Sequence, residues 1–164
     1  DGTALSVITP HPNPDLGALG VLALRAIHLW VPTKANPIDY TLTIEAQIKW
    51  YATNYNVLQF AYDPYQLHDM ATRLKKGFVC WTKPFGQMGQ RLEADKAFQD
   101  IIRDRRIAHS GSDIMEQAIK NCAAKRVIND NTKLRIIKKS NELLIDAAVA
   151  TSMACYVCQK LIWD

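Results

Sequence analysis

Three aspartates stand at positions where a carboxylate invites a chemical explanation. Asp63 follows the apolar run 57–62 and precedes Pro64, Asp146 lies inside a long apolar segment, and Asp1 precedes a short strand-like run. Carboxylates that converge from different elements repel one another unless cations lie between them. Mg²⁺ and Mn²⁺ are hard ions that prefer oxygen ligands. Because two such ions about 3.5–4 Å apart hydrolyse phosphodiesters, the aspartates predict a two-metal hydrolytic site.

Asp63 is expected at the rim of a sheet. Residues 57–62, VLQFAY, have the pattern of a buried strand, and a helix is expected over 66–76. Pro64 biases the residue before it toward extended backbone, and sites in α/β proteins form beyond the carboxyl ends of strands. The alternative is that Asp63 merely caps the following helix, because aspartate is a favoured N-cap residue.

Asp146 interrupts the segment LLIDAAVATSMACY, residues 143–156. A helix that is apolar on all sides is buried, so an ionised aspartate within it must be paired, coordinated or at the edge of a cleft. Small alanines beside it would let the helix pack closely on a sheet. The alternative is an ion pair with Lys138 or Lys139.

The order of predicted elements indicates an α/β fold with a mixed sheet. Two antiparallel strands are expected first, at 4–9 and 20–31, joined by a turn at 11–16. The remaining predictions are helix 42–54, strand 57–62, helix 66–76, strand 78–82, loop 84–91, helix 97–105, strand 106–109, helix 113–127, edge strand 133–137 and helix 141–162.

The composition is that of a globular chain. Apolar residues make up 48% and charged residues 22% of 164 residues, so we expect residues 1–164 to form a single domain. No apolar run approaches 18 residues, and therefore no membrane partner is expected. The formal charge of +4 favours polyanionic partners. Cys155 and Cys158 lack a second ligand pair at zinc-binding spacing, which favours core packing.

Four segments form a recognisable series along the chain. They are DGTAL at 1–5, YDPYQLHDMATRLKKG at 62–77, RIAHSGSDIMEQAIKNC at 106–122 and LRIIKKSNELLIDAAVATSMA at 134–154. In this order they resemble the C-terminal nuclease domain of the large terminase subunits of tailed phages. The resemblance extends over essentially the whole chain.

The resemblance implies a ribonuclease-H-like fold with a central mixed sheet of five or more strands flanked by helices. It implies that Asp63 and Asp146 are catalytic ligands of two Mg²⁺ or Mn²⁺ ions, with Asp1 as an accessory ligand. The family's first catalytic aspartate lies on an upstream strand. We therefore expect a chain truncated at its N-terminus, without that strand and without the ATPase domain.

The function implied by the resemblance is metal-dependent endonuclease cleavage of double-stranded DNA during phage DNA packaging. The implied partners are double-stranded DNA, the ATPase domain of the same polypeptide, the small terminase subunit and the portal. The implied location is the cytoplasm of the host cell.

Basic side chains and a histidine are further candidates for contacts with DNA. His109 matches the family's histidine, and Lys138 and Lys139 precede the last helix. Arg105 and Arg106 belong to a basic run, and contacts with a duplex backbone need only charge. For each of these residues the alternative is a structural role or a solvated surface.

Two other functions are left open by the sequence. One is a different ribonuclease-H-like nuclease, such as a resolvase or an integrase core, although the segment around His109 favours the terminase family. The other is a non-catalytic DNA-binding or docking module of a packaging motor, which would share the fold but have an incomplete site.

Overall fold

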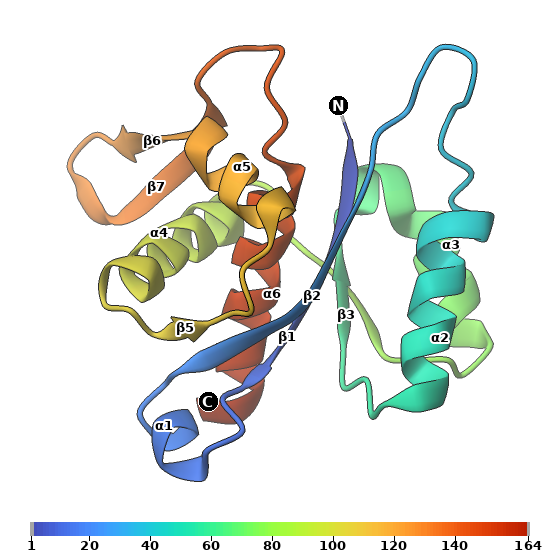
Figure 1. Ribbon diagram of the computed structural model, residues 1–164, viewed down its shortest axis with the longest axis horizontal. Helices are drawn as coiled ribbons and strands as arrows, with labels where there is room; N and C mark the ends of the chain where they lie inside the picture. The colour runs from blue at the N-terminus through green and yellow to red at the C-terminus, as the bar shows by residue number, and fades with distance from the viewer. Residues whose placement is uncertain (1, 164) are drawn as a thin grey trace. The chain divides into compact units, whose positions relative to one another are not determined.

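The computed structural model describes residues 2–163, and the chain forms two compact units (Figure 1). Unit 1 contains the chain up to Leu29 and again from Met88 onward, and unit 2 is Trp30–Gln87. Each unit has its own strands and helices. No helix within residues 2–163 is long and apolar enough to cross a membrane.

A three-stranded sheet with the order β1–β2–β5 lies in unit 1. Strand β1 (Thr3–Pro10) is followed by the short helix α1 (Pro14–Ala18) and then by β2 (Leu22–Trp30), which returns alongside β1 (Figure 1). Strand β5 (Ile107–Ala108) pairs in parallel with the first two residues of β2. The two predicted N-terminal strands and their pairing are confirmed.

The core of unit 1 lies between this sheet and two long helices, α4 (Gly89–Arg103) and α6 (Asp146–Trp163). Phe98 and Ile101 of α4 pack with Leu22 and with Cys155 and Cys158 of α6. The prediction that the two cysteines are core residues is confirmed. Burial raises the pKa of the Cys158 thiol to about 11, so this thiol is protonated at neutral pH.

Helix α5 (Asp113–Asn121) is shorter than predicted. Residues 122–127, expected to continue it, form strand β6 (Cys122–Val127), which pairs antiparallel with β7 (Asp130–Lys138). Asn129 adopts a φ of +61° in the tight turn between them, a conformation that asparagine tolerates better than most residues. Cross-strand pairing with β7 therefore outweighs the helical pattern of residues 122–127.

The first helical element of unit 2 is a π-helical turn, η1 (Thr41–Glu45), which continues into α2 (Ala46–Asn54). Strand β3 (Phe60–Tyr62), helix α3 (Pro64–Lys76) and strand β4 (Thr82–Pro84) follow. The two strands pair in parallel. Both strands are shorter than predicted, and β4 begins where the expected strand 78–82 ends.

The displacement of β4 has a local cause at the end of α3. The backbone N–H of Val79 donates to the carbonyl of Leu74, and that of Phe78 donates to Lys75. These bonds form a Schellman motif with Phe78 at a φ of +54°, a position usually occupied by glycine. Residues 78 and 79 terminate the helix and cannot begin a strand.

The expected central sheet of five or more strands is wrong. Within residues 2–163 the strands form sheets of three, two and two strands. The β3–β4 pair belongs to unit 2, and β6–β7 closes as a separate hairpin, so strands predicted for one sheet are divided among three. The α/β class is confirmed.

Glu45 links η1, α2 and α3 within unit 2. Its carboxylate accepts a hydrogen bond from Arg73 Nη2 at 2.6 Å and lies 2.9 Å from Lys49 Nζ. The hydrogen bond from Arg73, opposed by burial, lowers the pKa of Glu45. A carboxylate with a lowered folded-state pKa stabilises the fold above its unfolded pKa, and this contribution is lost as pH falls through the folded pKa.

Glu45→Gln is therefore expected to lower the free energy of unfolding at pH 7 by about 1 kcal/mol, a modest value because Arg73 is half exposed. The difference from the unsubstituted chain should shrink below pH 4 as Glu45 is protonated. Thermal melts from pH 7 to pH 3 measure both effects. Glu116→Gln, which removes an exposed pair with Lys120, is the control, and an equal change in both variants would contradict the role of Glu45.

Candidate functional site

Asp146 begins helix α6 beside the first strand of unit 1. Its Oδ2 accepts a hydrogen bond from the backbone N–H of Gly2 at 3.3 Å. The carboxylate lies in the first turn of the helix, where the helix dipole favours negative charge. The next residues, Ala147 and Ala148, are buried against Ala118 of α5. These small side chains let neighbouring elements approach closely and leave Asp146 half-buried.

Lys138 and Lys139 are the candidate partners of Asp146 in the alternative ion pair. Lys139 Nζ instead donates to the carbonyl of Lys120 at 2.6 Å, near the C-terminal end of α5, where a cation is favourable. Lys138 lies opposite Cys122 in the β6–β7 ladder. The ammonium of Lys139 is thus engaged at the end of α5, and an ion pair of Asp146 with Lys138 stays an alternative.

Asn121 holds the segment that leads into Asp146. Its Nδ2 donates to the carbonyl of Leu144 at 2.9 Å, and its Oδ1 accepts from Gln117 Nε2 at 2.9 Å. The backbone N–H of Lys139 donates to the carbonyl of Asn121 at 3.0 Å. The end of α5, the base of the β6–β7 hairpin and the approach to α6 are thus joined at one buried residue.

Asp63 lies in unit 2, between β3 and α3. Its φ of −72° and ψ of 114° are extended, as the following Pro64 favours. Its Oδ1 accepts a hydrogen bond from the backbone N–H of Tyr65 at 3.0 Å, so Asp63 is the N-cap of α3. The cap engages one oxygen, and a carboxylate has a second that can bind another ligand. Capping is therefore compatible with metal binding.

The three candidate metal ligands are distributed over the chain. Asp146 belongs to unit 1 and Asp63 to unit 2, whereas Asp1 lies outside the described residues. No group of three His, Cys, Asp or Glu side chains within residues 2–163 is arranged to hold a metal ion. The carboxylate oxygens of Asp63 and Asp146 have the chemistry that Mg²⁺ and Mn²⁺ require. The two-metal arrangement stays a prediction.

His109 follows β5, and its Nδ1 accepts a hydrogen bond from the backbone N–H of Gly111 at 3.2 Å. Strand β5 pairs with the beginning of β2, at the end of the sheet away from the start of β1 (Figure 1). Asp146 lies at the start of β1, against Gly2. The structure therefore does not bring His109 beside Asp146, and its contact with DNA stays a prediction.

The two arginines after α4 differ in their surroundings. Arg106 Nη1 donates to the carbonyl of Gly20 at 3.3 Å, and its Nη2 lies 3.8 Å from Asp104. Arg106 thus ties β5 to the connection before β2. Arg105 has a φ of +56° at the end of α4 and an exposed side chain. Of the two, Arg105 is better placed to meet a partner from solution.

Comparisons with known proteins show the family to which this chain belongs. Residues 32–160 match the family model of the endonuclease domain of the terminase large subunit. The chain belongs to this family of terminase endonuclease domains. A search of curated proteins finds no match.

The crystal structure of the HK97 bacteriophage large terminase has the same fold as this terminase domain. The TM-score is 0.76 at 16% sequence identity, and the match covers 96% of this chain and 36% of the HK97 chain. The chain therefore spans about a third of the length of that terminase. The α/β topology of the terminase endonuclease domain is shown by this likeness.

Sequence reasoning missed a buried polar cluster in the terminase domain. Asp95 of α4 is fully buried, and its Oδ1 accepts hydrogen bonds from Arg91 Nε at 2.8 Å and Ser152 Oγ at 2.7 Å. Its Oδ2 accepts from the backbone N–H of Ile136 at 2.9 Å. The four-residue spacing of Arg91 and Asp95, with Ala94 and Phe98 buried nearby, was a signal for a buried pair. The cluster joins α4, α6 and β7 and has a structural role.

Proposed function

We propose that this chain is a metal-dependent endonuclease domain that cleaves double-stranded DNA during phage genome packaging. The observation that carries the proposal is the match of residues 32–160 to the terminase endonuclease domain. The fold likeness to the HK97 bacteriophage large terminase supports it, because that structure is also of a phage large terminase.

Asp63 and Asp146 are the proposed metal-binding carboxylates, with Asp1 as an accessory ligand. Two bound Mg²⁺ or Mn²⁺ ions would supply an activated water and stabilise the leaving oxygen. The backbone N–H of Gly2 holds one oxygen of Asp146, and that of Tyr65 holds one oxygen of Asp63. Each hydrogen bond limits rotation of its carboxylate and so orients the second oxygen, as partners of metal ligands do.

The other proposed partners follow from the family. The ATPase domain of the same polypeptide, the small terminase subunit and the portal would act with this domain in packaging. His109, Lys138, Lys139, Arg105 and Arg106 are the proposed DNA contacts from the sequence. Among them, Lys139 also holds the end of α5, and Arg106 also holds the connection at Gly20.

Cleavage of supercoiled plasmid tests the proposal. We expect nicked and linear products with Mg²⁺ or Mn²⁺ and intact plasmid with EDTA, because hydrolysis depends on the metal. The assay is repeated with a chain extended upstream to include the family's first catalytic aspartate. Absence of metal-dependent cleavage by both chains would refute catalysis and favour the non-catalytic DNA-binding module.

A further inference from the structure

Positive charge is concentrated in the β6–β7 hairpin and its base. Residues 122–139 contain six lysines and arginines and one acidic residue, Asp130, which gives a formal charge of +5. The whole chain has a formal charge of +4, so the rest of the sequence is slightly acidic. The basic residues are Lys125, Arg126, Lys133, Arg135, Lys138 and Lys139. The basic character of the chain therefore resides in this hairpin.

The register of the hairpin separates an inner face from an outer face. Leu134 is buried and Ile136 packs against the core of unit 1, so their shared side of β7 is the inner face. Because side chains alternate along a strand, Lys133, Arg135 and Ile137 lie on the other side. The exposure of Ile137, at 37%, agrees with this assignment. Lys138, predicted to contact DNA, shares the inner side with Leu134 and Ile136.

Lys125 of β6 lies directly opposite Arg135 of β7. Such a pair shares one face of an antiparallel ladder, with Cβ atoms about 4.5–5.5 Å apart, and like charges in this position destabilise the hairpin. Asp130 lies at the turn and is 3.1 Å from Lys133 Nζ. The outer face, defined by Lys125, Lys133 and Arg135, thus carries three basic side chains, one of which is paired with Asp130 at the turn.

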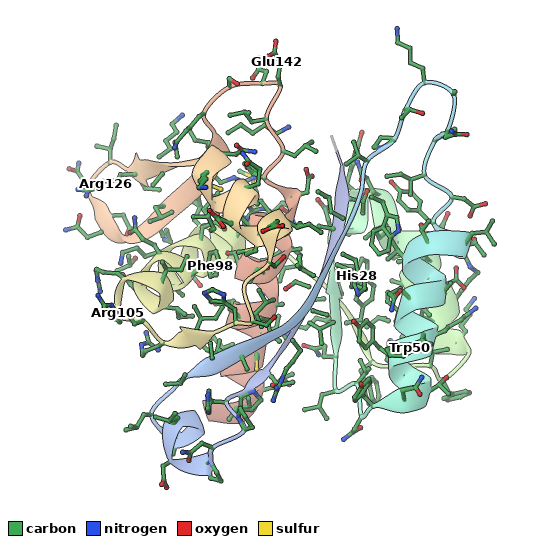
Figure 2. All side chains as sticks on the ribbon, in the orientation of Figure 1. His28, Trp50, Phe98, Arg105, Arg126 and Glu142 are labelled. Atoms are coloured by element: carbon green, nitrogen blue, oxygen red, sulfur yellow. The ribbon has the colours of Figure 1, made fainter. Side chains whose placement is uncertain are left out.

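The base of the hairpin is connected to the start of α6. Lys139, at the end of β7, donates its backbone N–H to the carbonyl of Asn121. Asn121 in turn holds the carbonyl of Leu144, two residues before Asp146. Figure 1 shows the hairpin, α5 and the segment that enters α6 on one side of unit 1, and Figure 2 shows the side chain of Arg126 near the hairpin tip. A ligand on the hairpin would therefore be held on the Asp146 side of this unit.

We propose that the outer face of the β6–β7 hairpin binds the phosphate backbone of duplex DNA through Lys125, Lys133 and Arg135. The inference rests on the proposed function, because it assumes that the substrate is double-stranded DNA. A two-stranded β-ribbon is narrow enough to lie along a groove of the duplex. Contacts of lysine and arginine with phosphates position the duplex without reading its sequence.

The test compares two double variants that remove equal charge. Lys125→Gln/Arg135→Gln neutralises the outer face, and Lys75→Gln/Lys76→Gln neutralises two exposed lysines at the end of α3. Binding of a fluorescent 30-base-pair duplex is measured by anisotropy in EDTA, over a range of salt concentrations. EDTA prevents cleavage, so the assay reports binding independently of the proposed catalysis.

We expect the hairpin variant to bind about tenfold more weakly in low salt, with a salt slope reduced by about 2, because each lost phosphate contact lowers the slope by about 1. The α3 variant should keep the slope of the unsubstituted chain. The melting temperatures of both double variants are measured beside the affinities, and the hairpin variant should remain folded at the temperature of the binding assay. This result would exclude unfolding as the cause of weaker binding.

Equal affinity and slope in the hairpin variant and the unsubstituted chain would overturn the inference, as would no binding of the duplex by the unsubstituted chain. Weaker binding of polyglutamate but not of DNA by the hairpin variant would also overturn it and indicate a protein partner. Hairpin-dependent DNA binding, with no plasmid cleavage by either this chain or the extended chain, would support the inference while refuting the nuclease. If the hairpin substitutions change neither cleavage nor DNA binding, the nuclease proposal is supported and the inference about the hairpin is overturned.

Discussion

Asp146→Asn is expected to reduce metal-dependent plasmid cleavage by more than about 100-fold. Asparagine keeps the shape of the side chain and an oxygen that can accept from the Gly2 N–H, but it loses the negative charge that attracts a divalent cation. Loss of a residue that only supports a metal ligand costs about 10–100-fold, so loss of a ligand should exceed that range. Initial cleavage rates in Mg²⁺ and Mn²⁺ measure the effect.

Asp113→Asn is the matched control for Asp146. Asp113 is also an aspartate in the first turn of a helix of unit 1, but it is exposed at the start of α5. Each substitution removes a favourable charge from a helix N-terminus, at a cost of about 0.3–1 kcal/mol in stability. Similar melting temperatures with very different cleavage rates would assign Asp146 to the chemistry. Equal cleavage by both variants would show that Asp146 only stabilises α6.

Asp63→Asn separates the two roles that Asp63 can have. Asparagine is as good an N-cap as aspartate, so a residue that only caps α3 should tolerate the substitution with unchanged cleavage. A metal ligand should not tolerate the substitution. We expect the cleavage rate to fall by an amount comparable to that for Asp146→Asn. Asp39→Asn is the control, because Asp39 Oδ1 accepts hydrogen bonds from the backbone N–H groups of Thr41 and Leu42 in the same unit.

The sequence predicted the features that depend on neighbours along the chain. Pro64 made Asp63 extended and able to cap α3, and the apolar setting of Cys155 and Cys158 predicted their burial. Asp146 stood out because it interrupts an apolar segment, and the structure places it at the half-buried start of α6. In these cases the sequence signal, a following proline or apolar flanking residues, lies within a few residues of the predicted position.

The features that the sequence did not predict depend on contacts between distant segments. Strand β6 exists because residues 122–127 pair with β7, and the division of the strands among three sheets follows from long-range packing. Trp50 and Trp81 have large aromatic side chains of the kind that often lies in a core, but they are 51% and 70% exposed. Residue type alone does not say which face of an element meets the core, so the exposure of these two tryptophans could not be predicted from it.

The contacts of the buried carboxylate of Asp95 also could not be predicted from the sequence, because they join distant segments. Two of its partners, Ile136 on β7 and Ser152 on α6, are 41 and 57 residues away in the sequence. Local periodicity contains no information about such contacts. The same contacts make Asp95 the residue whose loss should most affect the stability of unit 1, because α4, α6 and β7 all meet at its carboxylate.

Asp95→Ala is expected to lower the free energy of unfolding by about 3–5 kcal/mol, because it leaves the buried guanidinium of Arg91 without its carboxylate. It also removes the acceptor of the Ser152 hydroxyl and of the Ile136 N–H, and unsatisfied buried donors are costly. Asp95→Asn should have a free energy of unfolding between those of the unsubstituted chain and Asp95→Ala. Its amide oxygen can still accept a hydrogen bond, although the charge is lost. Urea unfolding followed by circular dichroism measures the three free energies.

Asp100→Ala provides the comparison on the same helix. Asp100 also forms ion pairs, with Lys96 and Arg103, but its side chain is 27% exposed. Water solvates the lysine and arginine left behind, so this substitution should cost less than about 1 kcal/mol. A cost for Asp95→Ala no larger than that for Asp100→Ala would mean that water reaches Arg91 once the carboxylate is removed. A large difference would instead establish that burial, and not the ion pair itself, makes Asp95 indispensable, because both aspartates pair with a cation and differ in their access to solvent.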